Sequence, residues 1–278
     1  MNRETCAYFR EKHGLERLEP IEKGWSSDVK YKAADKDGKL CLLRITPPGK
    51  DANRREMFEL TQRTASFGVP MCAPLGFGTC AEGTYSLFEW IDGVELEAAL
   101  ADLPDVEQYV YGVQAGEILQ KIHSIPAPDN VPDWAERFNA KASRKIEIFR
   151  SCPIQFEGGE AIIAYIEENR GLLENRPQCF QHGDYHVGNM MLDRAGKLRI
   201  IDFDRYDFGD PWEEFNRIPW CAQASPHFAT GLLNGYFGGE PPMEFWRLLA
   251  LYLGSNLLSS VSWAIPVSYT HLTLPTIC

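Results

Sequence analysis

The segment from Phe180 to Pro211 constrains this chain more than any other, because it sets two carboxylates and an amide beside short apolar runs. It reads FQHGDYHVGNMMLDRAGKLRIIDFDRYDFGDP. Residues 189–192 and 197–201 have the composition of two short strands, and residues 193–196 between them form a turn signal. The pattern predicts a hairpin that carries Asn189 at its entry and Asp202 at its exit, so that both lie at one end.

These side chains suit phosphoryl transfer, in which the protein mainly positions groups and neutralises charge. Magnesium takes oxygen ligands, typically one or two protein side chains together with nucleotide phosphates. Asn189 and Asp202 would supply such oxygens. A further carboxylate must orient the attacking hydroxyl and accept its proton, and Asp184 is the candidate. The spacing Asp-x-x-x-x-Asn, followed later by a metal-binding Asp, is that of a kinase catalytic loop.

The motifs HGDYHVGN and IIDFDRYDFGDPWEEF resemble the aminoglycoside phosphotransferase and choline kinase family, which is related to the protein kinases. Gly183 and Asp204 stand where protein kinases have arginine and glycine, and both differences are usual in the small-molecule branch. The resemblance extends to about residue 262. It implies an α+β, protein-kinase-like bilobal fold. A small antiparallel sheet lobe would span residues 1–91, and a larger, mainly helical catalytic and acceptor-binding lobe residues 92–278.

The N-terminal residues contain the elements that the resemblance assigns to the nucleotide. Composition and periodicity predict helices near 4–13 and 52–67 and strands near 29–33, 40–45 and 84–91. The segment 24–28 resembles the family's phosphate-covering loop, in which Ser26 and Ser27 could donate hydrogen bonds. The resemblance makes Glu89, Trp90 and Ile91 the hinge between the lobes, where backbone groups would meet adenine.

Arg44 lies between apolar strand residues, so it is either placed for function or turned to solvent by the alternation of the strand. The resemblance implies that it pairs the nucleotide phosphates and a glutamate of the following helix. A guanidinium offers a fork of donors to phosphate oxygens. Glu56 is the predicted partner because it lies off the apolar face of that helix, with Glu59 as the alternative.

Several residues of the catalytic segment have a second interpretation. Asp184 could cap a turn, and His182 is expected to hold the loop by hydrogen bonds. His182, Asp184 and His186 could ligate zinc, although a catalytic zinc usually needs three protein ligands and further histidines are scarce. Asp204 is assigned either to metal contact or to support of the site. Asp210 is predicted to begin a helix and to be structural.

The acidic residues Asp207, Glu213 and Glu214 follow the predicted metal ligand. They could bind ammonium groups of an acceptor, but a solvated acidic helix start explains them equally well. Residues 264–278 are Thr-rich at their end and lack a pattern, which suggests a truncated or foreign tail.

Composition limits the class of protein further. The chain has 278 residues, 44% of them hydrophobic, and a net charge of −11, which argues against a nucleic-acid surface and mildly favours a cationic small molecule. The start has no apolar signal segment, and no run of about 18 apolar residues follows. The eight cysteines form no C-x-x-C pair and are interpreted as reduced core thiols. A cytoplasmic protein without membrane or nucleic-acid partners is therefore expected.

The expected activity is transfer of the γ-phosphoryl group of ATP, with Mg²⁺, to a hydroxyl of a small cationic molecule, most like an aminoglycoside phosphotransferase. A metabolite kinase acting on choline, a sugar amine or an amino alcohol is the first alternative. The second is a catalytically silent nucleotide-binding module, against which the intact Asp184, Asn189 and Asp202 argue.

Overall fold

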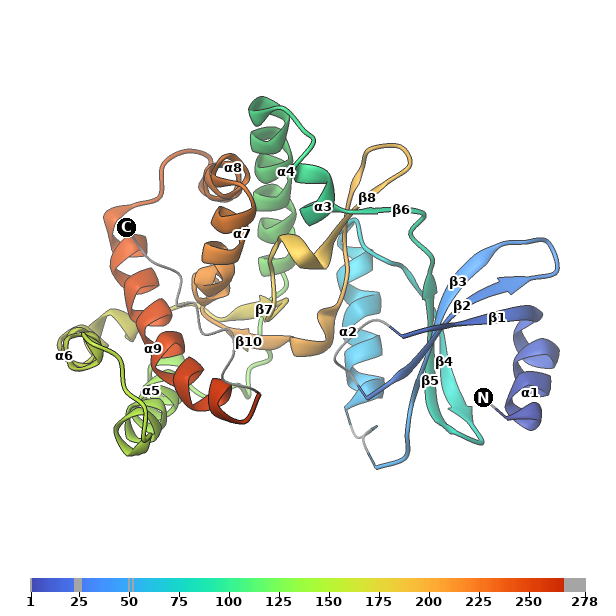
Figure 1. Cartoon of the computed structure of the whole chain (residues 1–278), viewed down its shortest axis with the longest axis horizontal. Helices are drawn as coiled ribbons and strands as arrows, with labels where there is room; N and C mark the ends of the chain where they lie inside the picture. The colour runs from blue at the N-terminus through green and yellow to red at the C-terminus, as the bar shows by residue number, and fades with distance from the viewer. Residues whose placement is uncertain (1, 23–26, 50, 52, 268–278) are drawn as a thin grey trace.

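The computed structural model describes residues 2–22, 27–49, 51 and 53–267. One part is a five-stranded sheet with two helices, and the other is mainly helical (Figure 1). Helix α2 lies between the sheet and the helical part, whereas α1 lies at the outer end of the molecule (Figure 1). The mixed helix and strand content predicted from the sequence is confirmed.

The sheet has the order β1–β2–β3–β5–β4, and each neighbouring pair is antiparallel. Successive side chains of a strand lie on opposite faces. In β5, Tyr85 and Leu87 therefore share a core with Phe9 of α1, whereas Phe88 packs against Phe58 of α2. The elements of this part are α1 (Arg3–His13), β1 (Leu15–Ile21), β2 (Val29–Asp35), β3 (Leu40–Thr46), α2 (Arg54–Ser66), β4 (Pro74–Cys80) and β5 (Gly83–Glu89).

The helical part is built around two apolar cores, one under α4 and α8 and the other between α5, α6 and α9. Its helices are α3 (Leu96–Leu100), α4 (Asp105–His123), α5 (Trp134–Ser151), α6 (Gly159–Glu168), α7 (Ile218–Ala224), α8 (Pro226–Phe237) and α9 (Met243–Val267). Short 3-10 turns are η1 (Arg170–Leu173), η2 (Val187–Asn189), η3 (Phe203–Arg205) and η4 (Glu213–Arg217).

Helices α4 and α8 approach each other through glycines. A Cβ on Gly116 of α4 would lie 2.3 Å from the carbonyl oxygen of Leu232, and one on Gly235 of α8 would lie 2.2 Å from that of Val113. These distances are too short for any side chain, so the two backbones touch directly. The pair of helices packs against the segment that carries the predicted catalytic residues.

Two small sheets hold the segment of the predicted catalytic residues in place. Strands β8 (Met190–Asp193) and β9 (Leu198–Ile200) form the predicted hairpin, with β6 (Gly93–Glu95) pairing on the outer side of β8. Strand β7 (Cys179–Gln181) pairs antiparallel with β10 (Asp207–Gly209). The predicted turn is closed by a 2.8 Å hydrogen bond from the N–H of Gly196 to the carbonyl of Asp193.

Two elements differ from expectation. Strand β1 was not predicted because it is a mostly exposed edge strand that contains Pro20. The helix expected from Trp212 is the turn η4 followed by α7, which starts anew with a proline in its first turn.

Within the described residues, no helix is long and apolar enough to cross a membrane. The cysteines described there are free thiols, and Cys41, Cys152, Cys179 and Cys221 are buried. The final residues, 268–278, which include most of the suspected tail, lie outside the described part of the chain.

Candidate active site

The β8–β9 hairpin brings the two predicted metal ligands to one end. Asn189 precedes β8 and Asp202 follows β9, and the N–H of Ile201 donates a 3.0 Å hydrogen bond to the carbonyl of Asn189. Asp202 has φ +66°, a left-handed conformation that is uncommon outside glycine. Because the backbone turns sharply there, the carboxylate of Asp202 lines the pocket described below.

The loop before the hairpin is held by a buried histidine. His182 is completely buried, and its Nε2 lies 2.9 Å from the carbonyl oxygen of Ile201. The N–H of Asp184 donates to Nδ1 of His182 at 3.2 Å. Since Nδ1 accepts this bond, the neutral ring carries its proton on Nε2 and donates it to Ile201. His182 therefore joins the loop to the end of β9, as expected.

A buried glutamate holds the same loop from the other side. Gly183 has φ +81°, and its N–H donates to Glu214 at 3.0 Å, as does the N–H of Tyr185 at 3.3 Å. Burial raises the pKa of Glu214, but the interaction with His123 and the hydrogen bond from the N–H of Gly183 oppose it, and the pKa lies below its usual value. Glu214 is thus an ionised carboxylate that binds two main-chain N–H groups.

Asp184 itself is reachable from solvent, with 19% of its side chain exposed. Nε of Arg217 lies 2.9 Å from its Oδ1, and Nε of Arg205 lies 3.8 Å from its Oδ2. The side-chain amide of Asn189 donates to the main-chain oxygen of Asp184 at 2.9 Å and lies 3.4 Å from Nε2 of His186. The amide nitrogen of Asn189 is the donor to Asp184, and its amide oxygen, which accepts no hydrogen bond from a described residue, is left to accept a cation.

A cluster of two arginines and two aspartates lies on the sheet side of the site. Arg44 donates to Asp28 through Nε and Nη2 at 3.2 and 2.7 Å and also binds Asp204. Arg54 of α2 bridges the same two carboxylates at 3.2 and 3.1 Å. Thr46 donates to Asp28 at 3.0 Å. The side chains of Arg44 and Asp28 are only 9% and 1% exposed.

Arg44 is therefore paired by Asp28 and Asp204 rather than by the predicted Glu56. Glu56 is exposed and interacts with Tyr206, and the alternative, Glu59, is exposed as well. The physical reason is helix geometry. Arg54 and Glu56 are two residues apart and so lie about 200° apart around α2. The face that meets β3 thus presents a cation.

Opposite charges in this cluster stabilise the charged forms of Arg44 and Asp204. Burial lowers the pKa of Arg44, but the charges of Asp204 and Asp28 outweigh it and raise the pKa above its usual value. Burial raises the pKa of Asp204, but Arg44 and then Arg54 lower it below its usual value. Two cations and two anions thus neutralise one another in a largely buried position.

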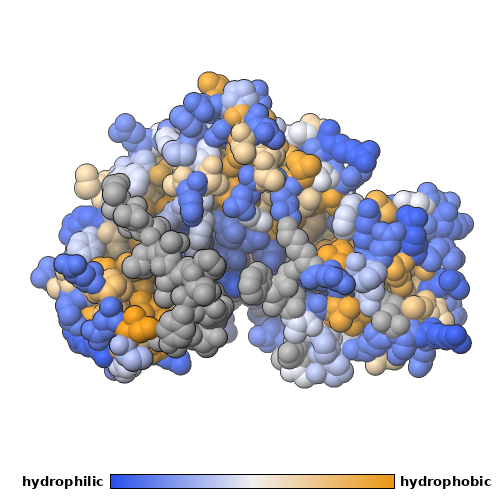
Figure 2. Space-filling model, viewed as in Figure 1, coloured by the Kyte–Doolittle hydropathy of each residue, from blue (hydrophilic) through white to orange (hydrophobic). Residues whose placement is uncertain are grey.

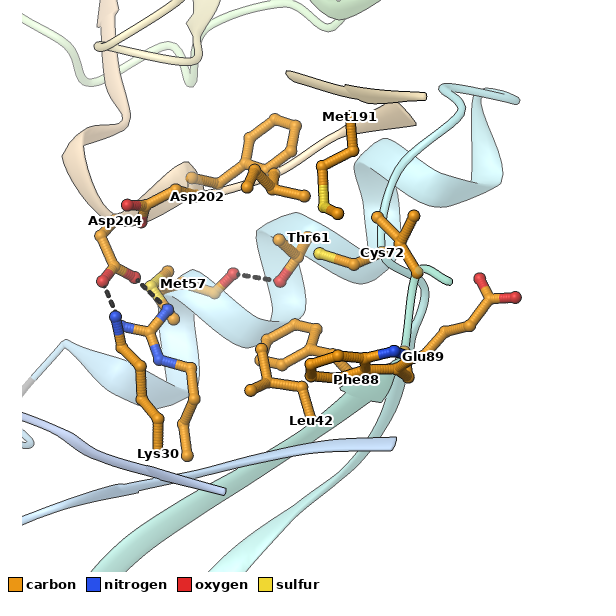
Figure 3. A pocket seen from close by; sticks show the side chains of 15 residues that line it. Lys30, Leu42, Met57, Thr61, Cys72, Phe88, Glu89, Met191, Asp202 and Asp204 are labelled. Atoms are coloured by element: carbon orange, nitrogen blue, oxygen red, sulfur yellow. Dashed lines mark hydrogen bonds and ion pairs between the residues drawn. The ribbon is translucent and has the colours of Figure 1, made fainter. Parts of the chain in front are cut away.

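A pocket of about 200 Å³ opens beside the cluster, between the sheet and the hairpin (Figure 3). Leu42 and Phe88 line it on the sheet side and Met191 on the hairpin side, while Asp202 and Asp204 lie next to each other at one end (Figure 3). The pocket is thus apolar at one end and charged at the other. Its dimensions and polarity suit a flat ring with an anionic substituent.

The predicted hinge residues Glu89, Trp90 and Ile91 all line this pocket. The carboxylate of Glu89 points away from the pocket and accepts a 2.6 Å bond from Arg199 (Figure 3). The N–H of Glu89 donates to the carbonyl of Ala73 at 2.8 Å, whereas the backbone of Ile91 has no hydrogen-bond partner in the described part of the chain. At Ile91 the main chain is therefore available to a ligand.

Of the two predicted loop serines, Ser26 lies outside the described residues. Ser27 is exposed, immediately before Asp28, and is not among the residues that line the pocket.

Sequence reasoning missed some residues and misread others. Glu213 and Glu214 are 8% and 2% exposed, so the solvated interpretation is wrong for both. Asp207 is exposed and bound by Arg137. Asp210 is completely buried between Arg176 and Tyr252 and is structural, as predicted. For the functions of Asp28, Arg54 and Arg217 the sequence offered no motif; only their contacts identify them.

The side chains of the site limit which metal ion it could hold. Among the described residues, no group of three His, Cys, Asp or Glu side chains could hold a metal ion, which argues against the alternative of a zinc site at His182, Asp184 and His186. No described side chain or N–H donates a hydrogen bond to the carboxylate of Asp202, and the amide oxygen of Asn189 is similarly unengaged. Two such oxygens fit the partial protein ligand set typical of magnesium.

Comparison with known families agrees with this geometry. The model of the phosphotransferase enzyme family matches residues 17–246, which is most of the chain. The chain therefore belongs to the phosphotransferase enzyme family. Its enzyme class is that of a small-molecule kinase, as the catalytic-loop motif predicted. No curated protein sequence matches the chain.

Solved structures share the fold. The ADP-bound aminoglycoside phosphotransferase APH(2'')-Ib has a TM-score of 0.69 at 15% identity, covering 99% of this chain and 93% of its own. A choline/ethanolamine kinase family protein from Mesorhizobium loti has a TM-score of 0.66 at 18% identity, covering 95% and 84%. A ternary complex of the phosphotransferase APH(4)-Ia with AMP-PNP and hygromycin B has a TM-score of 0.67 at 19% identity, covering 94% and 92%. The predicted protein-kinase-like fold is confirmed.

Proposed function

We propose that this protein transfers the γ-phosphoryl group of ATP to a hydroxyl of a small molecule. The observation that carries the proposal is the pocket. Its apolar end adjoins the unpaired backbone of Ile91, and its charged end holds Arg44 and Asp202. The solved relatives named above include complexes with ADP and AMP-PNP. In this view residues 1–91 and 92–278 are two lobes that meet around the nucleotide.

The adenine ring would lie between Leu42 and Phe88 on one side and Met191 on the other, with its edge bonded by the main chain at Ile91. The phosphates would then extend toward Arg44. A planar guanidinium can bind two phosphate oxygens at once. Because Arg44 already binds Asp204, the phosphates would compete with that carboxylate.

Asn189 and Asp202 would hold Mg²⁺ through their unengaged oxygens. When bound, such an ion neutralises charge on the phosphates of the nucleotide.

Asp184 would act on the acceptor. Its carboxylate orients the attacking hydroxyl and takes the proton as the new oxygen–phosphorus bond forms and the bond to the β-phosphate oxygen breaks, releasing ADP. His182 and Glu214 keep the loop in place through its main chain. Arg217, with its Nε 2.9 Å from Oδ1 of Asp184, forms an ion pair with this carboxylate.

The proposal is tested by incubating the full chain with Mg²⁺ and ATP and a panel of hydroxyl compounds that includes aminoglycosides, amino alcohols and sugar acids. ADP release is measured, and products are identified by ³¹P NMR. The proposal predicts a phosphomonoester of at least one acceptor. ATP binding without any transfer would instead support the silent nucleotide-binding module, and failure to bind ATP would reject both.

A further inference from the structure

Arg217 lies beside the carboxylate of Asp184, on the side where the acceptor would bind. Arg217 ends η4, and its guanidinium lies 4.7 Å from the ring centroid of Trp220. Nε of Arg217 is buried and makes no hydrogen bond of good geometry, although Asp184 Oδ1 is only 2.9 Å away. A guanidinium carries five donors. Those of Arg217 are left without hydrogen-bond acceptors in the described part of the chain.

A second cation lies on the neighbouring helix α5. Lys145 is one turn beyond Lys141, and Lys141 lies 3.5 Å from Glu213 of η4, the turn that Arg217 ends. Lys145 donates to Asn256 of α9 at 2.6 Å, and no described carboxylate forms an ion pair with it. Burial and the positive charges of Lys141 and Arg217 lower the pKa of Lys145 to about 8, although the negative charge of Glu213 opposes them. Two cations are therefore gathered without enough anionic charge between them.

The remaining charges near Asp184 do not restore the balance. Arg205 adds a cation 3.8 Å from Asp184. Glu213 is shared between Lys141 and Gln181, each at 3.5 Å. The exposed Glu97 of α3 raises the pKa of His186 against the effect of burial, but within the described residues it forms no ion pair with Arg217 or Lys145.

An apolar surface adjoins these cations. Trp220 of α7 is 48% exposed, and its ring lies 5.8 Å from that of His186. A large exposed aromatic beside a reactive carboxylate offers a face for the carbon skeleton of a ligand.

We propose that the acceptor carries an anionic group, a carboxylate or a phosphate, in addition to its hydroxyl, and that Arg217 and Lys145 bind this group while Trp220 covers the skeleton. Lys145 has no carboxylate partner among the described residues and Arg217 has only Asp184, so a bound anion would offset an excess of positive charge in a partly buried site. Arg217 would exchange Asp184 for the incoming anion and so release the base. This inference rests on the proposed function, and it specifies an anionic acceptor where the composition of the chain had favoured a cationic one.

The test uses compounds that share a skeleton and differ in charge. One set is gluconate, glucose 6-phosphate, glucose and glucosamine, and a second is glycerate, glycerol phosphate, glycerol and serinol. Binding to the full chain is measured by calorimetry in the presence of saturating Mg²⁺ and AMP-PNP, so that Arg44 is already occupied. We expect the anionic members to bind at least about tenfold more tightly than the others, and comparison of carboxylate with phosphate identifies the group.

Variants distinguish binding of the anion by Arg217 and Lys145 from a general effect of the positive charge on the protein. Arg217→Gln and Lys145→Gln should each weaken binding of the anionic compounds about tenfold and leave the affinity for AMP-PNP unchanged. Arg144→Gln is the matched control, because Arg144 lies on the same helix, is exposed and has no ion pair among the described residues. It should change neither affinity.

Tighter binding of glucosamine or serinol, or no binding of any anionic member, would overturn the inference, as would an equal loss in the Arg144→Gln control. Failure of the proposed function appears differently. AMP-PNP would then fail to bind, or an acceptor that binds would yield no ADP when ATP replaces the analogue.

Discussion

At the residue scale, Asp28 shows how the nucleotide end of the site is balanced. Its carboxylate accepts hydrogen bonds from Arg44, Arg54 and Thr46, and its side chain is 1% exposed. Together with Asp204 it offsets two arginines. Removing one member of such a buried group leaves an uncompensated charge, which typically costs 3–5 kcal/mol.

Asp28→Asn should therefore lower the free energy of unfolding by about 3 kcal/mol, measured by urea denaturation at neutral pH. The control is Asp37→Asn, in the exposed turn between β2 and β3, which should change it by less than about 0.5 kcal/mol. Equal effects of the two substitutions would show that the charge cluster is not stabilising.

Glu214 offers a second prediction. Glu214→Gln keeps the size of the side chain but removes the charge that accepts from Gly183 and Tyr185, and should cost about 1–3 kcal/mol at pH 7. Because the pKa of Glu214 is lowered from 4.5 in the folded protein, its contribution is complete above pH 4.5 and is lost as the pH falls through the folded value.

The measurement is urea denaturation of wild type and Glu214→Gln at pH 7 and in steps below pH 4.5. The difference in unfolding free energy should shrink as the pH falls. A difference that stays constant over this range would contradict an ionised Glu214.

The limits of sequence prediction are also clearest at this scale. Asp184, Asn189 and Asp202 were identified because their motif is local and its spacing follows from one hairpin. The partners of Arg44 were not, because Asp28 and Asp204 are 16 and 160 residues away along the chain. No periodicity or motif within α2 indicates such a contact.

At the scale of elements, α4 and α8 show two effects that compete. Alanine in place of a helical glycine favours the helix by about 1 kcal/mol. At Gly116, however, the new Cβ would lie 2.3 Å from the carbonyl oxygen of Leu232 and 2.4 Å from the nitrogen of Tyr236. Backbone atoms cannot move aside as flexible side chains do, so the steric cost should prevail.

Gly116→Ala should lower the free energy of unfolding by at least about 2 kcal/mol, the cost typical of overpacking. Gly171→Ala is the control, because nothing lies within 4 Å of a Cβ at that position. Thermal and urea denaturation of both variants measure the effect. A gain in stability for Gly116→Ala would mean that helix propensity decides and that the two backbones do not touch.

Elements were predicted well where their own sequence determines them. The hairpin has a turn signal between two apolar runs, and the helices predicted near 4–13 and 52–67 are observed as α1 and α2. Strand β1 depends on its partner β2 instead, since its own burial pattern is mostly exposed. The glycine contacts between α4 and α8 give no apolar signal, so only the structure reveals them.

At the scale of the whole molecule, ion pairs join the sheet to the catalytic segment. Asp204 of η3 is bound by Arg44 of β3 and Arg54 of α2, and Arg199 of β9 binds Glu89 of β5. Hydrophilic residues cover much of the visible face of both the sheet-bearing part and the helical part (Figure 2). Nucleotide and acceptor would thus meet where segments distant in sequence converge.

The central claim is that Asp202 serves the metal-bound nucleotide whereas Asp184 serves the acceptor. Calorimetric titration of Mg²⁺ and ATP into Asp184→Asn and Asp202→Asn, with ADP release measured in parallel, tests it most directly. The account predicts that Asp184→Asn keeps the wild-type affinity within about threefold and loses at least about 100-fold in turnover, whereas Asp202→Asn loses both. Full turnover in Asp184→Asn, or unchanged affinity in Asp202→Asn, would contradict it.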